Sequence, residues 1–106
     1  MAKKIPAERP VPTLVIQRLA SWGACVRKQR FGQNIRAADL CARMGITRPT
    51  LARLESGSVA VSAAAYLTAL HILGVADLAA PEMPAEIWRM DTSTARARPE
   101  ADDEYF

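Results

Sequence analysis

The sequence is poor in the residues that build metal, redox and catalytic sites. It holds two cysteines and one histidine in 106 residues. Cys25 and Cys41 lie sixteen positions apart, with neither a CxxC pair nor a histidine at ligand spacing. We therefore expect no metal, no cofactor and no disulfide, and both thiols to be small buried hydrophobic residues in a reducing compartment. No Ser/Cys–His–acid set and no glycine-rich phosphate loop is present, so we expect no enzyme activity.

Targeting signals and long apolar runs are also missing. The apolar stretch at residues 14–26 is interrupted by Gln17 and Arg18, so it fits neither a secretion signal nor a membrane span. We expect a cytoplasmic protein without membrane contact. Strand-type alternation is nowhere sustained, and alanine and leucine dominate. The sequence therefore predicts one all-α domain.

Charge is divided unevenly along the chain. Residues 1–57 carry eleven Lys or Arg against three acidic residues, a balance of +8. Residues 58–106 carry three Arg against eight acidic residues, a balance of −5. A cationic half suits a polyanionic partner, and an acidic half suits a basic protein surface or solubility. Chance clustering on solvated helix faces is the alternative.

Prolines and apolar periodicity divide the chain into three parts. We expect a disordered basic arm at residues 1–12, a helical domain at residues 13–80 and a proline-broken acidic tail at residues 81–106 that serves partner or dimer contacts. Thr13 and Ser62 are candidate helix caps, and we expect Leu67, Leu70 and Leu73 to face the core. The Val15, Leu19, Trp22 and Val26 stripe marks the first helix. Five helices are predicted, at residues 13–31, 36–44, 48–56, 63–73 and 77–80.

The stretch of residues 44–57 has the most specific local pattern. Gly45 can close one helix with a positive φ, and Thr47 can cap the next. Pro49 fits the first helical turn, where a missing N–H costs nothing. Leu51 and Leu54 face inward, whereas the polar side chains project elsewhere: Arg48, Thr50 and Arg53.

Residues 30–57, with the helix expected behind them, resemble the helix-turn-helix of the XRE (lambda-repressor-like) family. Residues 40–47 (LCARMGIT) match the second helix and turn, and residues 51–57 (LARLESG) match the third helix. The resemblance covers residues 19–78. It implies a five-helix lambda-repressor-like fold that binds double-stranded DNA.

The resemblance also implies roles for individual residues. Arg30 is expected to pair with Glu55 and so to hold the third helix against the first. Arginine bonds bidentately to guanine, and Thr or Pro contacts a thymine methyl, so base contacts are expected from Arg48, Pro49, Thr50 and Arg53. Phosphate contacts are expected from Arg27, Lys28, Arg36, Thr47 and Ser56.

Three positions depart from the family pattern. Ala37 stands where members often have a phosphate-binding glutamine, and Arg36 stands where a Ser or Thr cap is usual. Arg36 is a poor cap but a capable phosphate ligand. Asn34 replaces a frequent glycine, which is tolerable because asparagine accepts the left-handed conformation.

A narrower resemblance joins residues 48–57, 61–62 and 66–75 to HipB-like antitoxins, which are encoded beside HipA-type kinase toxins. It implies a nucleoid-associated homodimer that represses its own operon at an inverted-repeat operator and binds a HipA-like kinase toxin. Ile87 and Trp88 are candidate partner-docking residues; Trp88 either folds back onto its own domain or anchors a partner. The alternatives are a free-standing XRE repressor, and a protein-binding module that uses the helix-turn-helix as a scaffold.

Overall fold

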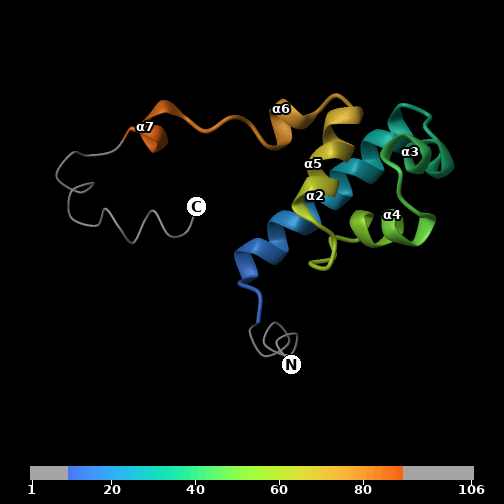
Figure 1. The fold of residues 1–106 in the computed structure, drawn as a ribbon, viewed down its shortest axis with the longest axis horizontal. Helices are drawn as coiled ribbons and strands as arrows, with labels where there is room; N and C mark the ends of the chain where they lie inside the picture. The colour runs from blue at the N-terminus through green and yellow to red at the C-terminus, as the bar shows by residue number, and fades with distance from the viewer. Residues whose placement is uncertain (1–9, 90–106) are drawn as a thin grey trace.

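The computed structural model describes residues 10–89, and the regular structure within them is entirely helical (Figure 1). The all-α prediction is confirmed. Each of the five expected helices begins and ends within one residue of its predicted bounds, and α7 is an additional short helix. The helices are α2 (Thr13–Gly32), α3 (Ala37–Met44), α4 (Arg48–Glu55), α5 (Ala63–Ile72), α6 (Ala76–Ala79) and α7 (Ala85–Trp88). The expectations for residues 1–9 and 90–106 lie outside the described part of the chain.

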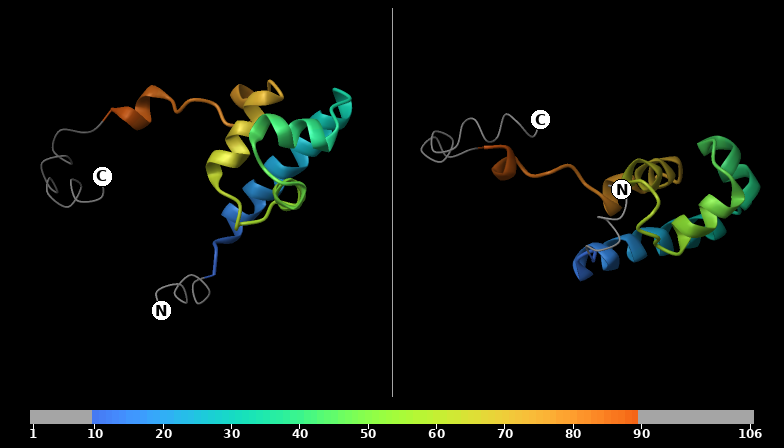
Figure 2. Two further views of the ribbon diagram at one scale, coloured as in Figure 1. Left: turned by 45° about the vertical axis from the view of Figure 1, so that its right-hand side comes forward. Right: turned by 60° about the horizontal axis from the view of Figure 1, so that its bottom comes forward.

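The long helix α2 is the support on which the others assemble. α4 and α5 both pack on it, α3 packs on α4 and α5, and α6 packs on α5 (Figures 1 and 2). Burying these inward faces removes apolar surface from water, which is the main favourable term in folding such a domain. The core consists of Val26, Leu40, Cys41, Leu51, Leu54, Tyr66, Ala69, Leu70 and Leu73.

The inward face of α5 differs from the predicted leucine stripe. Leu70 and Leu73 are buried as expected, but Leu67 is 40% exposed. Tyr66 takes its place, four residues before Leu70 and seven before Leu73, and its buried hydroxyl donates to the Ser58 carbonyl oxygen at 2.7 Å. Burial raises the pKa of the Tyr66 phenol. Ser62 caps α5 as predicted, accepting from the Ala65 amide at 3.1 Å.

The start of α2 also differs from expectation. Pro12, not Thr13, is the N-cap, and no side chain caps the helix. Trp22 packs against the core as expected, and its indole Nε1 donates to the Ala79 carbonyl oxygen at 3.3 Å. Val15, expected in the same stripe, is 42% exposed, because the covering helices do not extend over the first turns of α2.

Two glycines bring the end of α4 close to α2. A Cβ on Gly23 would lie 2.3 Å from the Leu54 carbonyl oxygen, and a Cβ on Gly57 would lie 2.6 Å from the Ala20 Cα. Gly57 also has a φ of +83°, which disfavours a side chain independently of the crowding. The backbones therefore meet with no side chain between them.

The two cysteines are free thiols. Cys41 is buried in the core, as predicted, whereas Cys25 is only half-buried at its edge. Across residues 10–89, no helix combines the length and the apolar character that a bilayer crossing requires.

Candidate nucleic-acid interface

A tight turn joins α3 to α4. Gly45 has a φ of +73°, and its amide donates to the Cys41 carbonyl oxygen at 2.8 Å, which ends α3. The Ile46 amide donates to the same oxygen at 3.1 Å, and the Ile46 side chain packs against the core. This turn fixes the direction in which α4 leaves α3.

The first turn of α4 is capped as predicted. The Thr47 hydroxyl oxygen accepts from the Thr50 amide at 3.3 Å. The two threonine hydroxyl oxygens also lie 3.0 Å apart, within hydrogen-bond distance. Pro49 stands in the first turn, where its missing N–H leaves no helical bond unmade. The beginning of α4 is therefore ordered by its own side chains.

α4 has a buried face and an open face. Leu51 and Leu54 are almost fully buried and attach the helix to the core. Arg48 lies at one flank of the open face, and the half-buried Thr50 lies at the other. The exposed residues of α4 and its C-cap are Arg48, Pro49, Ala52, Arg53 and Ser56.

A buried ion pair fixes α4 against α2. Arg30 Nε donates to Glu55 Oε2 at 2.8 Å, and Nη2 donates to Oε1 at 3.1 Å. The two side chains are only 10% and 11% exposed. Arg30 Nη1 also donates to the Ile35 carbonyl oxygen at 3.3 Å, which ties the loop before α3 to the same group. The hydrogen bond to Glu55 raises the Arg30 pKa above its usual value, although burial opposes the shift.

The surface between the start of α3 and α4 is hollow. A hollow of about 370 Å³ is lined by Ala37, Arg48, Pro49, Leu51, Ala52 and Glu55. Ala37 is the position at which the family resemblance expects a glutamine, and its methyl group leaves this space unfilled. Arg36 is the N-cap residue of α3 but makes no side-chain cap bond. The guanidinium of Arg36 therefore remains exposed beside the open end of α3.

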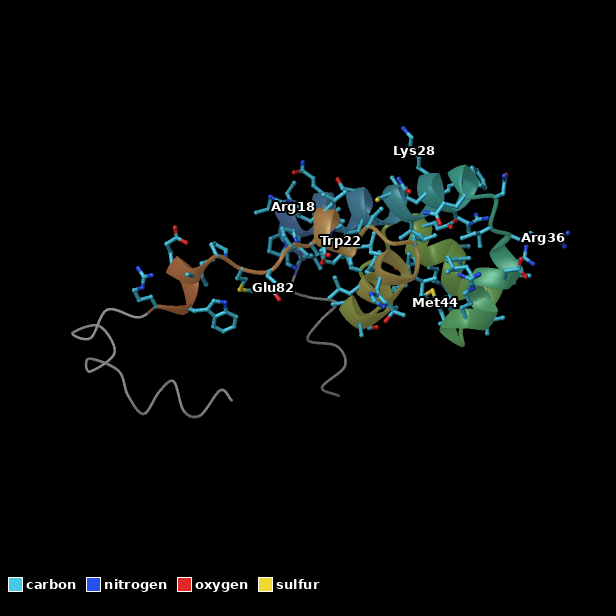
Figure 3. All side chains as sticks on the ribbon, turned by 90° about the horizontal axis from the view of Figure 1, so that it is seen from above. Arg18, Trp22, Lys28, Arg36, Met44 and Glu82 are labelled. Atoms are coloured by element: carbon cyan, nitrogen blue, oxygen red, sulfur yellow. The ribbon has the colours of Figure 1, made fainter. Side chains whose placement is uncertain are left out.

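The other residues expected to contact phosphate do not form one cluster. Helix geometry places Lys28 on the side of α2 opposite the buried Val26 and Arg30. Its side chain projects away from the other helices (Figure 3). Arg27 lies over the Phe31 ring, with its guanidinium carbon 5.1 Å from the ring centroid. The Ser56 hydroxyl donates to the Arg53 carbonyl oxygen at 2.8 Å. The structure thus places Arg36 directly before Ala37, which lines the hollow beside α4, and it separates Lys28 from α4.

Ala52 is a candidate contact that sequence reasoning missed. It is exposed on the open face of α4, one turn from Arg48 and from Ser56, at the side that borders the hollow. Selecting side chains for polarity passes over an alanine, although a small side chain there lets a partner approach the helix backbone closely. Ala52 is four residues after Arg48, and this helical spacing alone places it on the same face of α4.

Comparison with known proteins agrees with this geometry. Residues 22–82 match a family model described as a helix-turn-helix domain, which is more than half of the chain. The chain therefore belongs to the helix-turn-helix domain family. Neither the search of curated proteins nor the search of solved structures found a match. Family membership indicates a DNA-binding regulator, and such domains are typically not enzymes.

Proposed function

We propose that this chain is a sequence-specific transcriptional regulator of the XRE (lambda-repressor-like) type, acting as a dimeric repressor. The observation that carries the proposal is the exposed, cationic outer face of α4. That face follows a tight turn and is held from behind by Leu51, Leu54 and the Arg30–Glu55 pair. A helix presented in this way suits the major groove of duplex DNA.

Base recognition is assigned to α4. Arg48 and Arg53 are exposed on either side of Ala52, and arginine bonds bidentately to the O6 and N7 atoms of guanine. Pro49 and Ala52 offer apolar surface to a thymine methyl. Because the Thr50 hydroxyl is engaged by Thr47, we assign its methyl group to the same kind of contact.

Phosphate contacts are assigned to the rim around α4. Arg36 is exposed beside the start of α3, whose helix dipole also favours an anion. Thr47 and Ser56 flank α4 at its two ends and are exposed as well. Arg27 completes the set, whereas Lys28 would need a bent duplex to reach a phosphate. Contacts of this kind position the helix without reading sequence.

A two-fold dimer would present two α4 helices to successive major grooves about 34 Å apart. The operator would therefore be an inverted repeat, and the protein would be associated with the nucleoid. The HipB-like resemblance extends the proposal to an antitoxin that binds a HipA-like kinase toxin. Ile87 and Trp88 are 60% and 72% exposed, which supports a contact with another protein chain, either the toxin or a second copy of this chain. A free-standing XRE repressor and a protein-binding module that uses the fold as a scaffold are the competing functions.

Duplex binding by matched arginine variants tests the DNA-binding proposal. The probe is a labelled duplex from the region upstream of the protein's own gene, compared with a mixed-sequence duplex. Arg53→Ala should weaken binding to the cognate probe by roughly 1–3 kcal/mol. Arg36→Ala should weaken binding to both probes equally. Arg89→Ala, at the C-cap of the distant α7 (Figure 1), removes the same charge and should change neither. Unchanged cognate binding by a folded Arg53→Ala variant would refute the base-reading assignment.

Affinity capture tests the toxin proposal separately. The tagged full-length chain should retain a kinase-like protein, and deletion of residues 82–106 should reduce the retained amount. Capture of no such protein, together with intact operator binding, would favour the free-standing repressor. Capture of a partner by a chain that binds no duplex would favour the scaffold function.

A further inference from the structure

The first turns of α2 extend beyond the helices that cover the rest of it. The chain after α4 passes over α2 where Gly57 contacts Ala20. The six residues at positions 13–18 extend α2 by about 9 Å beyond this contact, toward its N-terminus. Val15 and Ile16 continue the inward-facing side of α2, yet they are 42% and 45% exposed. Within residues 10–89, nothing covers this apolar surface, which we call the α2 overhang.

A second uncovered apolar surface lies on α7. Ile87 and Trp88 are largely exposed, and in every view α7 stands apart from α2–α5 (Figures 1 and 2). Pro81 and Pro84 bound the connection from α6, and Pro84 has extended backbone angles of φ −67° and ψ 158°. Such a connection is stiff. An isolated helix of four residues is also unstable in water, so α7 requires a surface to fold against.

The two surfaces have complementary charges. Arg18 is the one charged residue in positions 10–22. Positions 81–88 contain two charged residues, Glu82 and Glu86, and both are acidic. Arg18, Trp22 and Glu82 also lie at the same end of the molecule, where the connection to α7 departs (Figure 3). With Arg89 included, the segment at residues 81–89 carries a net charge of −1 and the overhang carries +1. Neither surface is covered by another part of residues 10–89.

We propose that α7 of one chain docks on the α2 overhang of a second copy, and that the contact is exchanged reciprocally. Ile87 and Trp88 would cover Val15 and Ile16, with Glu86 beside Arg18. The stiff connection directs α7 away from its own α2, which favours exchange between chains over closure within one. A two-fold axis makes each contact twice, so two small patches combine into one isologous interface. This inference rests on the proposed function for the dimer's role, and it names the surfaces that form that dimer.

Sedimentation equilibrium of the full-length protein without DNA tests the interface. Wild type should be a dimer, and Val15→Glu or Trp88→Ala should raise the dimer dissociation constant at least about 30-fold. Gln17→Glu is the matched control, because Gln17 is exposed on the side of α2 opposite Val15 and its substitution should leave the constant unchanged. The tryptophan emission, to which Trp22 and Trp88 both contribute, should shift to the blue as protein concentration rises through the wild-type constant, and Trp88→Ala should abolish this shift. Circular dichroism establishes that each variant keeps its helices.

Charge exchange distinguishes docking between chains from docking within one. Arg18→Glu and Glu86→Arg should each weaken the homodimer several-fold, because each places like charges together twice. An equimolar mixture of the two variants should recover the wild-type constant, because both contacts in the mixed dimer then pair opposite charges. Closure within one chain would give no recovery on mixing.

A monomer at all concentrations, a dimer unaffected by Val15→Glu and Trp88→Ala, or a Trp88 shift independent of concentration would each overturn the proposal. The monomeric Val15→Glu variant should still bind a single half-site weakly, since its α4 face is unchanged. Loss of duplex binding by wild type would refute the regulator function and leave the dimer result standing. The two proposals can therefore fail separately.

Discussion

Replacing Gly23 by alanine should destabilise the domain, although alanine normally stabilises a helix. The new Cβ would lie 2.3 Å from the Leu54 carbonyl oxygen and 2.8 Å from that of Glu55. Ordinary contact begins at 3.4 Å, so the end of α4 would have to move by about 1 Å from α2. Both obstructing atoms are backbone oxygens, and no side-chain rotation can relieve the overlap.

The size of the effect follows from two opposed terms. Gly→Ala within a helix gains about 0.8–1.0 kcal/mol from propensity. Overpacking at a close helix contact costs about 1–3 kcal/mol or more, and a 1 Å shift would also strain the Arg30–Glu55 pair. We expect a net loss of up to about 2 kcal/mol in the free energy of unfolding, together with weaker duplex binding at temperatures where the variant is folded.

Gly32 provides the matched control in the same helix. A Cβ at Gly32 meets nothing within 4 Å, so Gly32→Ala should be neutral or stabilising by up to about 1 kcal/mol. Urea denaturation followed by circular dichroism measures both variants. Equal stability of the two variants would refute the close α2–α4 approach from which the placement of α4 is argued.

Further predictions concern the ion pair, the phenol, the rim of the interface and salt. Arg30→Ala should cost about 3–5 kcal/mol in thermal or chemical unfolding, because it leaves the Glu55 carboxylate buried without its partner. The folded-state pKa of Tyr66 is raised, so its neutral phenol stabilises the fold fully below the unfolded-state pKa of about 10, and the free energy of unfolding should fall as pH rises through the folded-state pKa. Tyr66→Phe should lessen that fall. An alkaline unfolding transition that Tyr66→Phe leaves unchanged would contradict this prediction. Ala37→Gln should tighten binding to all duplexes alike, without altering sequence preference, by adding a phosphate donor beside α4. If a dimer neutralises about 6–10 phosphates, its affinity for duplex DNA should fall about 10³–10⁵-fold between 50 and 200 mM salt. An affinity that does not change with salt would exclude the proposed phosphate contacts.

Local chemistry made the helices predictable from the sequence. The caps at Thr47 and Ser62 and the turn at Gly45 are determined by hydrogen bonds within a few residues, and all three appear as expected. Asn34 adopts the left-handed conformation anticipated for it, with a φ of 59°. These features depend little on what surrounds them, so a linear pattern suffices.

The departures arise where burial depends on distant segments. Tyr66 has the helical spacing of Leu70 and Leu73, but the sequence does not show that the Ser58 carbonyl oxygen is available to its buried hydroxyl. Val15 fits the apolar stripe, yet it stays exposed because the α4–α5 connection crosses α2 further along, at Ala20. The separation of Lys28 from α4 likewise depends on which side of α2 the other helices occupy. None of these facts is encoded in local spacing.

Selection of duplexes from a random pool by the purified protein, at 50 mM salt, tests the central claim most directly. Wild type should enrich an inverted repeat whose half-site centres lie about 10–10.5 base pairs apart. Arg53→Ala should enrich the same repeat with one base position in each half-site relaxed. Failure to retain any duplex, or identical enriched sequences for wild type and Arg53→Ala, would contradict the assignment of α4 as the helix that reads DNA.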